Sequence, residues 1–188
     1  MIPPRRVSPT NRAIRRTATP LMGVLVTLLA ACADYSFTVN EKLVYTPEPL
    51  FRDFEVPDAA LARCLRQHIT DADVRAAEQL KELNCSHAGV ATLQGLEVFA
   101  HLVRLKLSNN QISDLAPLAN MPALEELYLD NNALRSIMPL RGDPGLLVLD
   151  LGGNDTLVCA QLDYFRRQPG LELSAPAHCP AIDADPAA

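Results

Sequence analysis

A repeat of 22 residues in the middle of the chain constrains the fold more than any other feature of the sequence. Residues 102–123 and 124–145 match at seven positions with this constant offset. The matched pairs are Leu102/Leu124, Leu105/Leu127, Leu107/Leu129, Asn110/Asn132, Ile112/Leu134, Leu115/Ile137 and Leu118/Leu140. Degraded copies flank them at 80–101 and 146–159, as is usual for the terminal repeats of a solenoid. Unrelated amphipathic strands would not keep seven positions in step, so the sequence predicts a solenoid of stacked repeats.

Each repeat begins with the pattern LxxLxL, whose alternating leucines point to one face of a short strand. An asparagine then marks the turn, as Asn110, Asn132 and Asn154, while the first repeat has Ala88 at this position. A buried amide can satisfy backbone groups that no regular ladder reaches, so we expect stacked asparagines to form a ladder between repeats. One repeat cannot bury its leucines alone, whereas three or more stacked repeats form a continuous core.

The second half of each repeat has helix-like spacing of its apolar residues but is interrupted by proline. Four prolines lie in these segments: Pro117, Pro122, Pro139 and Pro144. Proline lacks a backbone N–H and clashes with the preceding turn of a helix. We therefore expect short 3₁₀ or extended segments, rather than long helices, on the convex side.

This pattern resembles the leucine-rich repeat superfamily, and specifically the short 22-residue class of bacterial internalin-like proteins. The resemblance covers about half of the chain at the level of repeats, residues 80–159. It implies an α/β fold, a short leucine-rich repeat solenoid whose curved parallel sheet lines a concave face. The family mostly binds proteins, although proteins that share a fold differ widely in function.

Both ends of the solenoid should be covered, because a bare end would expose apolar side chains to water. Within 58–79, Asp58 can cap a first helix with apolar residues at spacing four, and Thr70 can cap a second, shorter helix. This arrangement is similar to the helical cap that precedes the repeats of internalin-like proteins. Residues 160–180 should form a C-terminal cap that includes one last short strand, and 181–188 a disordered tail.

Residues 1–31 have the composition of a processing segment. The first twenty residues carry five arginines and no acid, and an apolar run follows at 21–31 that is too short for a permanent membrane helix. The run ends in Leu29-Ala30-Ala31-Cys32, which resembles the lipobox of bacterial lipoproteins. That resemblance implies cleavage before Cys32 and acylation of its thiol and amine, giving a stable anchor. An ordinary secretory signal followed by a chance cysteine is the alternative.

Resemblance to lipoproteins also implies a location in the cell envelope. Ala33, rather than an aspartate, follows Cys32, which favours the outer membrane if the organism has two membranes. The connecting segment, 32–57, holds five of the nine aromatic residues of the chain, which is unlike a plain tether. We expect an edge strand at 35–39 and order against the cap at 42–54. A surface aromatic cluster that binds a partner is the alternative for this segment.

The charge balance limits the classes of ligand. The whole chain has 17 basic and 22 acidic residues, a net charge of −5, and loss of the five leading arginines would leave 12 against 22, or −10. A strongly acidic protein is a poor match for nucleic acid or for anionic lipid surfaces. The sequence has no G-x-S-x-G, no H-E-x-x-H and no phosphate loop, so we predict neither an enzyme nor a cofactor.

Four cysteines remain besides the proposed lipidation site: Cys64, Cys85, Cys159 and Cys179. An even number in an exported chain predicts two disulfides. Of the three possible pairings, locality favours Cys64–Cys85 and Cys159–Cys179, each worth about 3 kcal/mol. A zinc site made of Cys64, Cys85, His68 and His87 is the alternative. It is disfavoured because oxidation competes and no acid is in place to orient a histidine ligand, so we predict no metal.

The residues between the strand leucines would line the concave face. They include a basic patch, Arg104 and Lys106, beside an acidic row that ends in Tyr128 and Asp130. Such a mixed charge field around a central tyrosine is typical of a modest protein-binding patch. The sequence therefore predicts a monomeric module that binds an unidentified protein through six residues: Arg104, Lys106, Glu126, Tyr128, Asp130 and Asp150.

Two alternatives remain for this face. A solvated strand surface that only keeps the solenoid soluble explains the same charges equally well. The other is a structural envelope lipoprotein that binds peptidoglycan or another glycan. A glycan site usually needs exposed aromatic rings that stack on sugars, and Tyr128 is alone on the predicted face, which favours a protein ligand.

Overall fold

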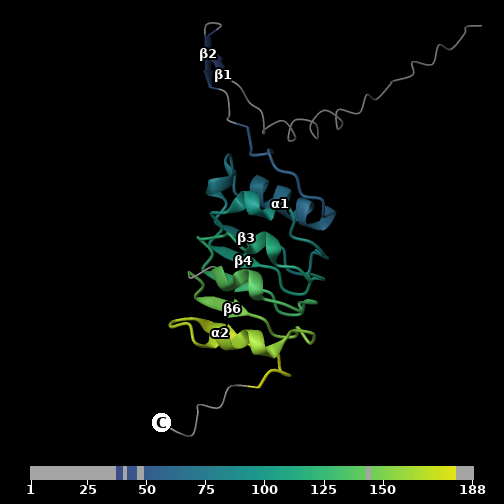
Figure 1. Cartoon of the computed structure of the whole chain (residues 1–188). Coiled ribbons are helices and arrows are strands. Elements are labelled where there is room, and N and C mark those ends of the chain that lie inside the picture. The colour runs from purple at the N-terminus through teal and green to yellow at the C-terminus, as the bar shows by residue number, and fades with distance from the viewer. Residues whose placement is uncertain (1–36, 40–41, 46–48, 143–144, 181–188) are drawn as a thin grey trace, which may run out of the picture. The chain divides into compact units, whose positions relative to one another are not determined.

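The structure is a computed structural model that describes residues 37–39, 42–45, 49–142 and 145–180 (Figure 1). The predicted processing segment, Cys32 and the tail at 181–188 lie outside the described residues. The chain divides into two compact units, residues 1–47 and 48–188. No helix in the described part of the chain is both long and apolar enough to cross a membrane.

The first unit contains an antiparallel pair of strands, β1 (Phe37–Val39) and β2 (Lys42–Tyr45). An edge strand was predicted at 35–39, and its described residues, 37–39, do form a strand. Its partner is β2, which follows it directly in the chain.

The second unit contains the solenoid, with five parallel strands in chain order. They are β3 (Glu82–Asn84), β4 (Arg104–Lys106), β5 (Glu126–Tyr128), β6 (Val148–Asp150) and β7 (Glu172–Ser174). Leu83, Leu105, Leu127 and Leu149 lie opposite one another in the register, so the 22-residue offset of the sequence is also the pairing offset of the sheet. The leucine-rich repeat solenoid predicted from the sequence is confirmed (Figure 1).

The asparagines of the turn hold neighbouring repeats together through their side chains. Asn132 Nδ2 donates to the carbonyls of Leu107 and Leu129, both at 3.0 Å, and its Oδ1 accepts from the Ile112 N–H at 3.0 Å. Asn154 repeats this pattern one coil later and is fully buried. Asn110 does the same towards the first repeat, where it accepts two N–H groups. Each amide thus donates to carbonyls of two consecutive coils. The strands have only three residues each, so their own hydrogen-bond ladder does not include these carbonyls.

One position of the turn has a left-handed backbone conformation in each of the four repeats. The residues, with their φ angles, are His87 (57°), Asn109 (57°), Asn131 (54°) and Gly153 (68°). Asparagine and glycine tolerate this region better than most residues do, whereas a histidine occupies it at a cost. The common offset of these four residues reflects one turn geometry repeated four times.

The side of the solenoid away from the sheet is built from short 3₁₀ helices, as the prolines predicted. They are η2 (Leu96–Phe99), η3 (Ala116–Leu118), η4 (Met138–Gly142) and η5 (Cys159–Gln161). The first three contribute buried apolar residues to the core, whereas η5 has none. The core runs from Leu61 to Phe165. The leucines of β3 to β6 are buried, and Leu173 of β7 is partly buried.

The N-terminal cap has one α-helix, α1 (Ala59–Asp71), and Asp58 is its N-cap, as predicted. The prediction of a second helix that starts at Thr70 is wrong. Thr70 lies inside α1, where its hydroxyl donates to the carbonyl of Arg66, and only a 3₁₀ turn, η1 (Ala77–Gln79), follows. The chain reverses at Asp73, which has a φ of 50°, and this reversal buries Val74.

Residues 49–57 pack along this cap. Phe51 and Phe54 lie against the buried Phe99 ring with centroid distances of 5.9 and 5.5 Å. Gly95 is approached so closely by the backbone of Glu55 that a Cβ atom there would lie 2.1 Å from the Glu55 carbonyl oxygen. The two phenylalanines therefore belong to the packing of the cap rather than to an open aromatic surface.

The C-terminal cap consists of α2 (Leu162–Arg166) and β7. Leu162 and Phe165 of α2 are buried, and β7 is the last short strand predicted from the sequence. Both predicted disulfides are confirmed, Cys64–Cys85 in the N-terminal cap and Cys159–Cys179 in the C-terminal cap.

Candidate functional site

The face of the sheet opposite the core is open, and we define the open face by the ten strand residues whose side chains alternate with the leucines. They are Glu82, Asn84, Arg104, Lys106, Glu126, Tyr128, Val148, Asp150, Glu172 and Ser174. This is the face predicted from the sequence to be concave. The parallel register places these residues in two rows that run across all five strands. Side chains in one row are neighbours although they are 22 or 24 residues apart in the chain.

The first row is organised around Arg104. Its Nε and Nη2 atoms donate to the two oxygens of Glu126 at 2.6 and 2.7 Å, which is a bidentate pair. Its Nη1 donates to Glu82 at 2.9 Å on the other side. The guanidinium is thus shared by carboxylates of the preceding and the following strand, so Arg104 is held in place before any ligand arrives.

These contacts shift the ionisation of the row in a consistent direction. The hydrogen bonds and charge of Glu126, with that of Glu82, raise the pKa of Arg104. The hydrogen bonds from Arg104 lower the pKa of Glu126. Burial raises the pKa of Tyr128, and so does the hydrogen bond of its hydroxyl to Glu126 at 3.2 Å. At neutral pH the pair is charged and the tyrosine is neutral.

The second row brings Lys106 over the ring of Tyr128, with Nζ 5.0 Å from the ring centroid. No carboxylate lies within ion-pair distance of Lys106 in the part of the chain that the structure describes. The exposed cation of the predicted basic patch is therefore Lys106 alone, because Arg104 is neutralised by two glutamates. A lysine above an aromatic face is a modest attraction that leaves its ammonium free for a second partner.

The predicted acidic residues are placed beside this centre. Asp130 follows β5 and accepts from the Ser108 hydroxyl and, at 2.9 Å, from Asn131 Nδ2. Asp150 accepts from the Gly152 N–H at 3.0 Å. All six residues predicted to bind a partner thus lie on one side of the sheet, on the strands β4, β5 and β6 or directly after them.

Sequence reasoning missed two parts of this surface. His68 of α1 lies at its first edge, where it lines a hollow of about 210 Å³ together with Glu82, Asn84, Arg104 and Lys106. Glu172 and Ser174 extend the rows onto β7. The strand β7 itself was predicted, but the change of spacing from 22 to 24 residues hides the place of Glu172 and Ser174 in the rows. Nothing in the sequence links a helix histidine to the sheet.

The alternative zinc site is not assembled. Cys64 and Cys85 form a disulfide, and both nitrogens of His68 lie near backbone groups, the Cys64 carbonyl at 3.1 Å and the Asn84 N–H at 3.3 Å. His87 is exposed in a left-handed turn. Among the described residues, these four do not form a group with converging donor atoms.

Comparison with known proteins agrees with the geometry. The family model described as leucine-rich repeats (two copies) matches residues 100–142, which span β4, β5 and the turns that join them. The solenoid therefore has the leucine-rich repeat fold. No curated protein sequence matches the chain significantly.

Among solved structures, the chain is similar to two internalins of Listeria monocytogenes. The internalin inlF shares 28% sequence identity with a TM-score of 0.57, and the match covers 64% of this chain and 37% of that one. The internalin C2 shares 27% identity with a TM-score of 0.54, covering 63% of this chain and 54% of that one. The chain thus spans less than two thirds of the length of each internalin.

Leucine-rich repeat domains of this kind are typically protein-interaction modules and are usually not catalytic. The described residues whose pKa is shifted, apart from Asp58 at the helix cap, are Arg104, Glu126 and Tyr128, which lie side by side on an open surface. Side chains arranged in this way can orient and complement a macromolecule.

Proposed function

We propose that the chain is a lipid-anchored protein of the cell envelope whose leucine-rich repeat domain binds a protein partner through the open face. The observation that carries this proposal is the preorganised centre made by Arg104, Glu126, Tyr128 and Lys106. Side chains that are already fixed lose little conformational entropy when a partner binds. Tyrosine and arginine are also the residue types that most often dominate binding energy at protein interfaces.

The surroundings of this centre suit a protein ligand. Leu147, directly before β6, is 50% exposed and is followed by the half-buried Val148 of the open face. Apolar side chains beside a fixed polar centre, with acidic residues around them, have the composition of an interface with a polar rim.

A glycan ligand is less compatible with the same geometry. Tyr128 is the one aromatic residue among the ten positions of the open face, and the Lys106 ammonium lies over its ring. A sugar that stacks on Tyr128 would have to displace this cation. We therefore place the glycan-binding structural lipoprotein second.

The proposed anchor rests on the lipobox-like Leu29-Ala30-Ala31-Cys32. Three acyl chains on one residue would hold the domain stably at a membrane, whereas a single chain would not. Ala33 after the cysteine favours the outer membrane where two membranes are present. Cells that express the chain should incorporate labelled palmitate into it, and Cys32→Ser should abolish the label; a label that persists would refute the anchor.

The partner is tested by crosslinking in cells followed by affinity capture. One variant combines Lys106→Glu with Tyr128→Ala on the open face, and a matched control combines Met138→Ala with Val158→Ala at two exposed positions outside the strands. We expect one defined protein from the wild type and the control, and its loss from the open-face variant. Recovery of the same protein from the open-face variant, with circular dichroism unchanged, would place binding elsewhere.

A further inference from the structure

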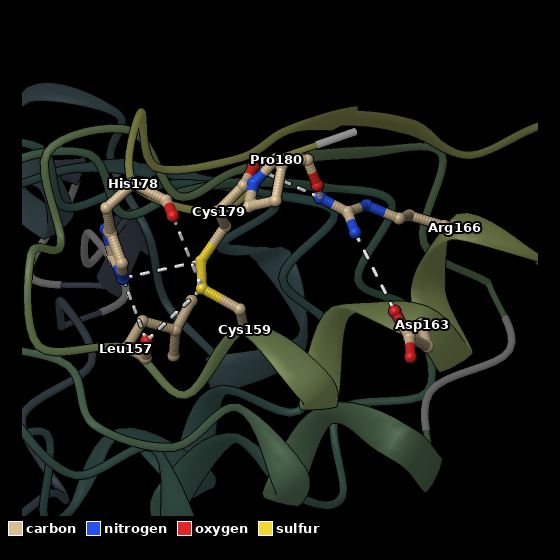
Figure 2. A network of polar contacts seen from close by, with 7 residues as sticks. All are labelled: Leu157, Cys159, Asp163, Arg166, His178, Cys179 and Pro180. Carbon is tan, nitrogen blue, oxygen red and sulfur yellow. Dashed lines mark hydrogen bonds and ion pairs between the residues drawn. A yellow bond between two sulfur atoms is a disulfide. The ribbon is translucent and has the colours of Figure 1, made fainter. Parts of the chain in front are cut away.

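The C-terminal cap brings two thiol sulfurs and one imidazole together at a single point (Figure 2). The donor atoms of Cys159, His178 and Cys179 all lie within 4.8 Å of one another. Among the described residues of this chain, this is the one such group of three metal-ligating side chains. As a disulfide the two sulfurs cannot bind an ion, but their separation into thiolates would leave three ligands converging on one position.

We propose that the reduced form of the C-terminal cap binds a single zinc ion through Cys159, Cys179 and His178. Two thiolates and an imidazole are ligands that zinc prefers, and three protein ligands leave a fourth position open to water. The disulfide and the zinc site would then be two alternative states of the same cap, selected by the thiol redox state.

The distances already suit the metal-bound state. His178 Nε2 lies 3.4 Å from Cys179 Sγ. Zn–N and Zn–S bonds at a tetrahedral angle place the nitrogen and sulfur about 3.6 Å apart. On reduction the sulfurs must part to about 3.8 Å for the same ion. Cys159 is half-exposed and can make this movement, whereas Cys179 is buried.

The ligand histidine is positioned by the backbone of the solenoid. In the disulfide state, Nε2 lies 3.0 Å from the carbonyl oxygen of Leu157, so this nitrogen carries the proton and donates it. Zinc would take the lone pair of the same nitrogen, and the ring proton would move to Nδ1. The Leu157 contact therefore holds the ring near the sulfurs before the metal binds.

Contacts other than the disulfide hold the donors together. Arg166 Nη2 donates to the carbonyls of Cys179 and Pro180, at 3.3 and 2.6 Å (Figure 2). Arg166 is itself fixed by Asp163, 3.7 Å away, on the helix α2, whose Leu162 and Phe165 are buried. Segment 178–180 should consequently stay beside Cys159 after the sulfur–sulfur bond is broken.

The N-terminal disulfide has a histidine nearby but a different arrangement. His68 Nδ1 is 3.7 Å from Cys64 Sγ, and the ring nitrogens face the Cys64 carbonyl and the Asn84 N–H. Cys85 is not brought close enough to complete a group of three. This cap therefore serves as an internal control in the same molecule.

Reduction of the disulfide and binding of zinc are two separate steps. An external dithiol gives two electrons to the Cys159–Cys179 bond and leaves as its own cyclic disulfide, while the protein gains two thiols. Zinc then replaces the two thiol protons, which are released to solvent. Thiol–disulfide exchange of this kind needs access to a sulfur, which the half-exposed Cys159 provides.

The test uses the full chain with Cys32→Ser, so that no fifth thiol contributes. A phosphine reductant replaces the dithiol, because dithiols chelate zinc, and zinc is added at equimolar amounts. Bound zinc is counted after gel filtration, and cadmium is used in parallel to detect the thiolate-to-metal charge-transfer band. The variants are Cys159→Ser with Cys179→Ser, and His178→Ala; the matched control is His68→Ala.

We expect one zinc per reduced chain and none on the oxidised chain. The double serine variant should lose it, His178→Ala should weaken it at least about tenfold, and His68→Ala should leave it unchanged. An unchanged affinity in His178→Ala, or a reduced folded chain without zinc, would overturn the proposal. Loss of the circular dichroism signal on reduction would also overturn it, because the Arg166 contacts would then have failed to hold the donors.

Discussion

The N-terminal cap ends the sheet with a helix, whereas the C-terminal cap adds a strand to it. On the N-terminal side, His68 of α1 accepts the Asn84 N–H of β3, and Asp58 ties the start of α1 to the first repeat. On the C-terminal side, β7 pairs with β6 in the same parallel sense as the repeats do. The N-terminal cap thus satisfies backbone N–H groups with side chains, and the C-terminal cap extends the backbone hydrogen bonding of the sheet by one strand.

The difference shows that a disulfide alone does not determine the structure of a cap. Both caps have one, with sequence separations of 21 and 20 residues, yet the elements that they join are different. What distinguishes the caps is where the remaining backbone groups find partners.

The largest expected effect comes from removing each disulfide in turn. Replacing either pair by serine should lower the free energy of unfolding by about 3 kcal/mol, and by a similar amount in both caps, because the closed loops have nearly the same length. Denaturant unfolding of the two double variants measures this directly. A difference above about 2 kcal/mol between them would show that native contacts, rather than chain entropy, determine the contribution.

Asp58→Ala should have the next largest effect. One carboxylate accepts from the N–H groups of Ala60 and Leu61 in the helix, and from those of Ala91 and Thr92 in the first repeat. Loss of an N-cap together with two further hydrogen bonds should cost about 2 to 3 kcal/mol.

The matched change in the other cap is Asp163→Ala. It removes only a half-exposed ion pair with Arg166, so a loss within about 0.5 kcal/mol is expected. Equal losses for Asp58→Ala and Asp163→Ala in the same denaturant titration would contradict the distinction between the caps.

Acid should weaken the N-terminal cap through the same aspartate. Burial alone would raise the pKa of Asp58, but the four backbone N–H groups outweigh it and hold this pKa below its ordinary value of 3.8. The unfolded chain therefore binds the proton more readily, and the stabilisation is present above pH 3.8 and lost as the pH falls through the folded value. Wild type should lose more stability than Asp58→Asn between pH 5 and pH 3, by thermal unfolding. Equal losses of stability in the wild type and in Asp58→Asn would argue against a role of the Asp58 carboxylate in this pH dependence.

Effects smaller than that of Asp58→Ala are expected at the left-handed turn of the first and last full repeats. Gly153→Ala should cost about 1 to 2 kcal/mol, because the residue has a φ of 68° and a Cβ atom would lie 2.2 Å from Asn131 Oδ1. His87→Gly, at the same place in the first repeat, should change stability by no more than about 1 kcal/mol and in the opposite direction. Thermal melts of the two variants that move in the same direction would show that the four turns are not equivalent.

The core could be predicted from the sequence because leucines at a fixed offset fix the register in which the repeats stack. The rows of the open face follow from the same offset, so Arg104 and Glu126 could be placed on neighbouring strands in advance. Their pairing could not, because an ion pair depends on side-chain conformation. The glutamates neutralise Arg104, and the predicted basic patch is thereby reduced to Lys106.

The errors occurred where local and tertiary preferences compete. Thr70 has the side chain of an N-cap, but its hydroxyl bonds back to the Arg66 carbonyl, and burial of Val74 determines where the chain turns. His68 could not be assigned to the sheet edge because sixteen residues and a chain reversal separate it from Asn84.

Site-specific photocrosslinking tests the central claim most directly, since it needs no prior identity of the partner. A photoreactive amino acid replaces Tyr128 on the open face in one chain and the 41% exposed Met138 of η4 in another. If the open face binds the partner, cells irradiated in parallel should give a discrete crosslinked band from position 128 and none from position 138. A band from position 138 alone would contradict binding through the open face.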